Sequence, residues 1–109
     1  MLFKRKRKRN KIIKHIQKKI EITQKINIFE FEKLLQLNYE IVFEYNGDKY
    51  EIIQNENYIE LHNNCFFVDK STKSLSYTKF TNSKEFIENA KIGDKKISQI
   101  INEIKIISF

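Results

Sequence analysis

The chain has 109 residues with a single cysteine, no proline and no tryptophan, and its net charge is +7. That length allows one domain and an appendage, and one cysteine excludes an intrachain disulfide, so we expect a reducing, cytoplasmic location. The two histidines and the cysteine follow neither HExxH nor paired CxxC spacing, which excludes the common zinc motifs, and we expect no metal or other cofactor.

The first 25 residues hold most of the positive charge. They contain eleven basic residues and one acid, Glu21, so they carry about +10 and residues 26–109 carry about −3. Lys4–Arg9 is an unbroken basic run, and apolar residues then recur at helical spacing: Ile12, Ile13, Ile16 and Ile20. We expect residues 1–25 to be a basic arm, disordered at first and then an amphipathic helix over about 10–24. Its apolar stripe either docks on the body or stays free until a partner binds.

The chain start, Met1-Leu2-Phe3 followed by basic residues, is similar to the charged end of a signal peptide. No apolar run follows that is long enough for a signal peptide or a membrane span. We therefore expect neither secretion nor a transmembrane segment.

A better-marked helix begins after Asn27. The Asn27 side chain can cap the helix, Glu30 lies three residues further on, and Ile26 with Phe31 can form a hydrophobic staple. The helix should end near Leu37.

Asn46-Gly47 marks a β-hairpin, because this pair supplies the positive φ angles of a tight type I′ turn. A two-residue loop places Phe43 opposite Tyr50, Ile41 opposite Ile52, and Glu44 opposite Lys49. A second hairpin is expected around Asn63-Asn64, between Tyr58–His62 and Cys65–Val68, followed by a strand over Leu75–Phe80.

Two further helices should close the body. Asn82 with Glu85 forms a second capping-box pattern, Gly93 suits a helix stop, and Asp94 can cap the next helix. That last segment carries apolar residues at helical spacing, and Lys105–Phe109 can form a terminal strand. The fold class predicted for residues 26–109 is a single α+β domain, an antiparallel sheet of four or five strands covered on one face by two to three helices.

Catalytic chemistry is not indicated. Both glycines have structural explanations, so no phosphate-binding loop is present, and Glu30 and Glu85 are assigned to helix capping. We predict a protein that is not an enzyme.

The basic arm is the best candidate for a binding site. Lysine and arginine side chains suit phosphate groups, and such contacts position a protein on nucleic acid without reading its sequence. The candidate nucleic-acid-binding residues are Lys4, Arg5, Lys6, Arg7, Lys8, Arg9, Lys11, Lys14, Lys18 and Lys19. The partner would be nucleic acid or a nucleic-acid-bound protein complex.

The sheet face opposite the core is the second candidate. In the predicted register Glu40, Glu44 and Glu51 project from it. Such a face can be an ordinary solvated surface, can hold the protein's own arm, or can bind a basic protein.

Three hypotheses about function follow. In the first, this is a small non-enzymatic protein whose arm binds nucleic acid or a ribonucleoprotein; its narrower form is a mobile-element inhibitor of a host nuclease complex, of the anti-CRISPR kind. In the second, it is a protein-interaction module of the immunity-protein or antitoxin type that uses the acidic sheet face. In the third, the isoleucine stripe of the arm lies on an anionic membrane surface.

Overall fold

The computed structural model describes residues 11–63 and 77–109, which form an α+β fold. Its centre is a five-stranded antiparallel sheet in the order β4-β3-β2-β1-β7. The strands are β1 (Ile41–Tyr45), β2 (Asp48–Gln54), β3 (Ile59–Asn63), β4 (Tyr77–Phe80) and β7 (Lys105–Ser108). A separate two-stranded sheet pairs β5 (Lys91–Ile92) with β6 (Lys95–Lys96).

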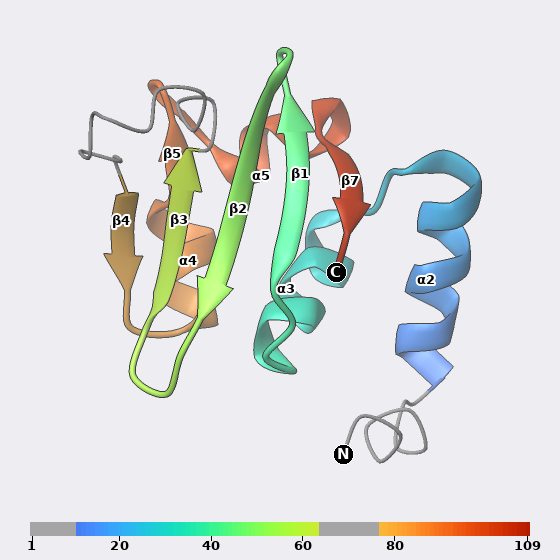
Figure 1. Cartoon of the computed structure of the whole chain (residues 1–109), viewed down its shortest axis with the longest axis horizontal. Coiled ribbons are helices and arrows are strands. Elements are labelled where there is room, and N and C mark those ends of the chain that lie inside the picture. The colour runs from blue at the N-terminus through green and yellow to red at the C-terminus, as the bar shows by residue number, and fades with distance from the viewer. Residues whose placement is uncertain (1–10, 64–76) are drawn as a thin grey trace, which may run out of the picture.

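The helices are α2 (Lys11–Thr23), α3 (Ile28–Gln36), α4 (Ser83–Asn89) and α5 (Ile97–Ile100), with a 3-10 turn, η2 (Ile101–Glu103), directly after α5. Helices α3, α4 and α5 lie behind the main sheet in Figure 1, and α2 lies beyond the edge strand β7. The other face of the sheet, turned toward the viewer, carries none of the described helices. The predicted fold class, a sheet with helices on one face, is confirmed.

The first hairpin forms with the predicted register. Phe43 is paired with Tyr50, Ile41 with Ile52, and Glu44 with Lys49. The turn residues Asn46 and Gly47 have φ angles of 55° and 84°, both in the left-handed region that a type I′ turn requires.

The capping box of α3 also forms as predicted. The backbone N–H of Glu30 donates to Asn27 Oδ1 at 2.8 Å, and the backbone N–H of Asn27 donates to Glu30 Oε1 at 2.9 Å. This reciprocal pair satisfies two donors that the first helical turn would otherwise leave without partners.

The core lies between the sheet and the helices behind it. Phe31 of α3 is the central contact, because its ring centroid lies 6.3 Å from both Phe43 of β1 and Phe86 of α4. Alternate strand residues supply the sheet side of the core: Ile41, Phe43, Tyr50, Ile52, Ile59, Leu61 and Ile106. None of the polar or charged residues in the described ranges is buried.

Two predictions for the C-terminal part were wrong. Helix α4 ends at Asn89, and Gly93, with φ 67°, lies in the turn between β5 and β6 and does not stop the helix. The residue that precedes α5 is Lys96, so Asp94 does not cap it. The sequence signal was ambiguous because a left-handed glycine serves a hairpin turn as well as a helix end.

Only one of the two hydrogen bonds of the predicted capping box of α4 forms. The Asn82 side chain accepts the Glu85 N–H at 2.8 Å, but the Glu85 carboxylate accepts the Thr81 N–H in place of the Asn82 N–H. Further along the sheet, β3 has β2 on one side and β4 on the other. Its expected hairpin partner, Cys65–Val68, lies outside the described residues.

Candidate nucleic-acid interface

Helix α2 is packed against the body through the isoleucine stripe that the sequence marked. Ile13, Ile16 and Ile20 are 1%, 0% and 9% exposed and belong to the same core as the sheet, whereas Ile12, the fourth predicted member, is 46% exposed. At about 3.6 residues per turn, the spacing of the three buried residues places them on one side of the helix. The sequence left open whether the stripe docks on the body or stays free, and in the structure it docks.

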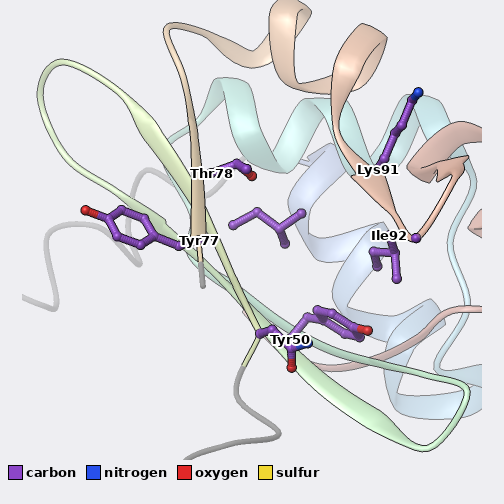
Figure 2. A pocket seen from close by; sticks show the side chains of 8 residues that line it. Tyr50, Tyr77, Thr78, Lys91 and Ile92 are labelled. Carbon is purple, nitrogen blue, oxygen red and sulfur yellow. The ribbon is translucent and has the colours of Figure 1, made fainter. Parts of the chain in front are cut away.

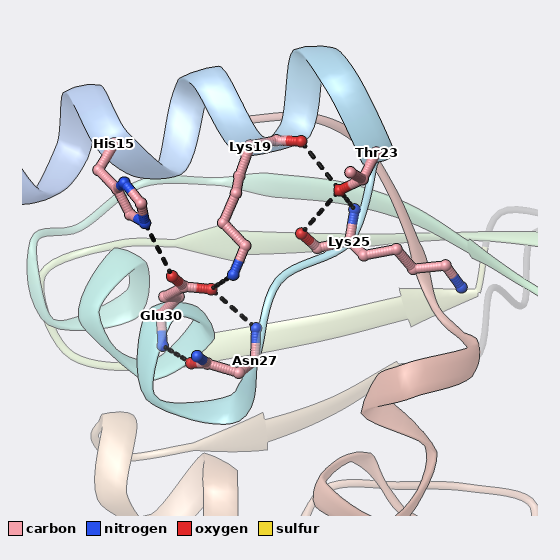
Figure 3. A network of polar contacts seen from close by, with 6 residues as sticks. All are labelled: His15, Lys19, Thr23, Lys25, Asn27 and Glu30. Atoms are coloured by element: carbon pink, nitrogen blue, oxygen red, sulfur yellow. Dashed lines mark hydrogen bonds and ion pairs between the residues drawn. The ribbon is translucent and has the colours of Figure 1, made fainter.

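A polar network centred on Glu30 joins α2 to α3 (Figure 3). The Lys19 ammonium donates to Glu30 Oε1 at 2.7 Å, and His15 Nε2 lies 3.7 Å from Glu30 Oε2. Burial alone would raise the pKa of the Glu30 carboxyl. The hydrogen bonds from Lys19 and Asn27 and the charges of Lys19 and His15 outweigh burial, so this pKa lies below its ordinary value.

The segment that follows α2 is hydrogen-bonded to residues near the C-terminus. The Ile106 N–H of β7 donates to the Gln24 carbonyl at 2.8 Å, and Lys25 Nζ donates to the Asn102 carbonyl at 2.8 Å. Gln24 adopts a left-handed φ of 62° there. These bonds fix the position of the segment that joins α2 to the body.

This docking determines which cations face solvent. Lys11, Lys14 and Lys18 are exposed and fall within an arc of about 60° around the helix, roughly 130–170° away from the buried stripe. They form a row about 10 Å long. We call these three residues the lysine row.

The other predicted arm residues are placed differently. Lys19 belongs to the Glu30 network, so it is not part of the lysine row. Lys4–Arg9 lies outside the described residues and precedes the lysine row in sequence, with one residue, Asn10, between them. One carboxylate, Glu21, lines a shallow depression on α2 together with Gln17 and two members of the row.

The predicted acidic sheet face carries lysines as well as glutamates. Glu44 and Glu51 lie on the face opposite Phe43 and Tyr50, as the register required. Glu44 has lysines opposite it on both neighbouring strands, Lys49 of β2 and Lys105 of β7.

The rest of this open face also carries both acidic and basic side chains. Glu60 lies opposite Lys79, and its Oε1 is 2.8 Å from His62 Nε2, whose ring stacks on Tyr77 at 4.7 Å. Glu40 precedes β1, and its carboxylate accepts the Gln54 N–H at 3.2 Å. Glu44 and Glu60 thus have lysines opposite them, whereas Glu51 lies opposite Val42 and His62.

A cavity of about 230 Å³ lies between the main sheet and the β5–β6 hairpin (Figure 2). Tyr50, Leu61 and Ile92 line it with Thr78, while the side chains of Tyr77 and Lys91 point away from it. Ligand pockets are typically about 300–1,000 Å³ with a few convergent polar groups. The cavity is smaller than that range, and its one ammonium group points outward, so we assign it no ligand.

Within residues 11–63 and 77–109, no group of three or more histidine, cysteine or carboxylate side chains is arranged to hold a metal ion. No helix in this part of the chain is both long enough and apolar enough to cross a membrane. Neither a protein-family profile, a curated protein nor a solved structure matches this chain.

The sequence did not identify the lysine row within the longer basic arm. A helical wheel could have separated Lys11, Lys14 and Lys18 from the apolar stripe, but it could not show that the stripe is buried. It also could not assign Lys19 to Glu30, because the two residues are 11 positions apart on different helices.

Proposed function

We propose that this protein binds nucleic acid through its phosphate backbone, using the lysine row of α2 together with the basic run Lys4–Arg9. The observation that carries the proposal is the burial of Ile13, Ile16 and Ile20, because it holds the row outward on a helix that is already formed. A site that is ordered before binding loses less conformational entropy when the partner arrives.

The length of the row suits a phosphate backbone. Successive phosphates on one strand of a duplex are about 3.4 Å apart along the helix axis, so a row of about 10 Å spans roughly three of them. Lysine ammonium groups act there as point charges, and contacts of this kind do not depend on base sequence. We expect binding with little sequence preference.

The test is the salt dependence of binding to a short fluorescent duplex. Changing Lys11, Lys14 and Lys18 to glutamine should reduce the slope of log K against log salt by about three, since each lost phosphate contact removes about 0.9. The matched control changes Lys49, Lys79 and Lys105, which are also exposed lysines, and should leave the slope nearly unchanged.

Circular dichroism should show that both triple variants are folded. Equal losses of affinity in the two variants would mean that net charge, and not the lysine row, controls binding. Wild-type protein that does not bind the duplex at about 50 mM salt would overturn the proposal.

The narrower hypothesis, an inhibitor of a host nuclease complex of the anti-CRISPR kind, is supported by charge segregation: a segment of about +10 is joined to a body of about −3. Such a chain suits a target that presents both phosphate and basic protein. An RNA-guided DNA cleavage assay with purified nuclease complex and increasing amounts of this protein tests it. Unchanged cleavage at saturating protein would count against it.

The second candidate is a protein-interaction module that uses the open sheet face. It is favoured by the position of Glu44 and Glu51 on a face that carries none of the described helices. The lysines opposite Glu44 make this face less acidic than a basic partner would require. Reversal of both charges to lysine should abolish a complex of this type, and binding that survives the reversal argues against it.

The membrane hypothesis needs the isoleucine stripe to contact lipid. Of the four isoleucines of that stripe, Ile13, Ile16 and Ile20 are buried against the body, and Ile12 is 46% exposed. Membrane binding would thus require α2 to leave the core. Co-sedimentation with anionic vesicles at low salt tests this, and protein that stays in the supernatant removes the hypothesis.

A further inference from the structure

A second basic site lies on the hairpin formed by β5 and β6. In its register Lys91 is directly opposite Lys96, and Ile92 is opposite Lys95. Like charges directly opposite each other on antiparallel strands are unfavourable. The shortest strand pair of the described fold therefore contains a repulsive cross-strand pair.

The apolar side of the hairpin explains why it forms despite this repulsion. Ile92 packs against the core, Ala90 is buried, and the Ile97 N–H closes the hairpin on the Ala90 carbonyl at 3.0 Å. Gly93 supplies the positive φ of the turn. These contacts hold Lys91 and Lys96 beside each other.

Both lysines are directed toward solvent. Lys91 and Lys96 are exposed, and the Lys91 side chain points away from the adjacent cavity (Figure 2). Across the part of the chain that the structure describes, no carboxylate forms an ion pair with either ammonium group. An oxyanion placed between the two groups would replace their repulsion with two charge-assisted hydrogen bonds.

The hairpin and the lysine row lie at opposite ends of the molecule. Figure 1 shows β5 near one end of the long axis and α2 at the other, and the described residues extend 40 Å along that axis. Strands β2, β1 and β7 lie between them in this view. Two separate phosphate backbones can thus approach the two sites from different sides.

We propose that Lys91 and Lys96 form a second phosphate-contact site, so that one molecule holds two nucleic-acid segments at the same time. The inference rests on the proposed function, because the first segment is bound by the lysine row. Effective concentration favours the second contact once the first has formed on a long or folded nucleic acid.

The experiment is a capture assay with two duplexes. One duplex is fixed on beads, the full chain is added, and retention of a second, fluorescent duplex is measured after washing. Wild-type protein should retain the second duplex. The Lys91→Gln/Lys96→Gln variant should lose most of that retention while it binds the fixed duplex with less than about a threefold loss, since phosphate contacts at the two ends are separate.

The matched control is Lys49→Gln/Lys105→Gln, which removes two exposed lysines that lie opposite Glu44 and not opposite each other. It should retain both duplexes. Sedimentation velocity of wild-type protein without nucleic acid determines whether retention comes from single molecules or from a self-associated form.

The outcomes separate the two proposals. Wild-type protein that binds the fixed duplex but never retains the second one overturns the second site and leaves the proposed function intact. Retention that is undiminished in the Lys91/Lys96 variant, or that is explained by a dimer, also overturns it. Failure to bind the fixed duplex at all overturns the proposed function itself.

Discussion

The ammonium group of Lys19 lies 2.7 Å from Glu30 Oε1. The same carboxylate oxygen accepts the backbone N–H of Asn27, the N-cap residue of helix α3. One side chain therefore performs two tasks: it caps α3 and joins α2 to it. Glu30 is also only 14% exposed, so its contacts are less screened than those of a surface ion pair. This relationship explains why one lysine of the basic arm is not available for a partner.

Truncation of the buried stripe should measure the docking of α2. Ile16→Ala should reduce the free energy of unfolding by about 2–5 kcal/mol, because it removes a fully buried side chain from the core. Ile22→Ala, at a position that is 74% exposed, should change it by less than about 0.5 kcal/mol. Urea denaturation of both variants makes the comparison, and equal effects would show that α2 is not docked in solution.

Substitutions of Glu30 should separate its two tasks. Glu30→Gln keeps a side chain that can complete a capping box but removes the ion pair, and it should cost less than about 1 kcal/mol. Glu30→Ala removes both and should cost about 1–2 kcal/mol. Thermal unfolding monitored by circular dichroism compares the loss of stability in the two variants. A loss for Glu30→Gln as large as that for Glu30→Ala would contradict the capping role.

The stability of the protein should depend on Glu30 in acid. The folded state holds the pKa of this carboxyl below its ordinary value of 4.5, so the folded protein binds fewer protons than the unfolded chain. The contribution is fully present above pH 4.5 and is lost as the pH falls through the lower folded-state pKa. Denaturation midpoints measured across this range should fall less steeply for Glu30→Gln than for wild type, and equal slopes would contradict the role of Glu30.

The hairpin turn should be sensitive to a methyl group at Gly47. Its φ of 84° is one that L side chains rarely adopt, while nothing lies within 4 Å of the place that a Cβ atom would occupy, so only backbone strain opposes the change. Gly47→Ala should cost about 1–2 kcal/mol. Asp48→Ala, an exposed neighbour, is the control, and a smaller loss for Gly47→Ala than for this control would argue against the type I′ turn.

Removal of the lysine pair on β5–β6 should not weaken the fold. Lys91→Gln/Lys96→Gln removes a like-charge cross-strand pair, so the free energy of unfolding should stay the same or rise by about 0.2–1 kcal/mol. Thermal unfolding at low salt is the measurement, because screening reduces the effect. A clear loss of stability would mean that the two lysines serve the fold and would weaken their assignment to a ligand.

Local patterns in the sequence were sufficient for much of the fold. Asn46-Gly47 determined a hairpin register that the structure reproduces pair by pair, and Asn27 with Glu30 determined where α3 begins. Both signals act over a few residues, because φ preference and side-chain capping depend only on nearby backbone. Gly93 shows the limit of such signals, since its positive φ was compatible with two different local structures.

The candidate site depended on contacts between distant parts of the chain. The charge segregation of residues 1–25 from the rest is a property of the sequence alone, and so is the isoleucine stripe of α2. Only the tertiary structure determined that the stripe is buried and that Glu30 engages Lys19. It also placed Lys105 of β7 beside Glu44. These outcomes depend on which surfaces meet when the strands and helices pack, and burial and charge pairing across such surfaces are not encoded by the spacing of residues within one segment.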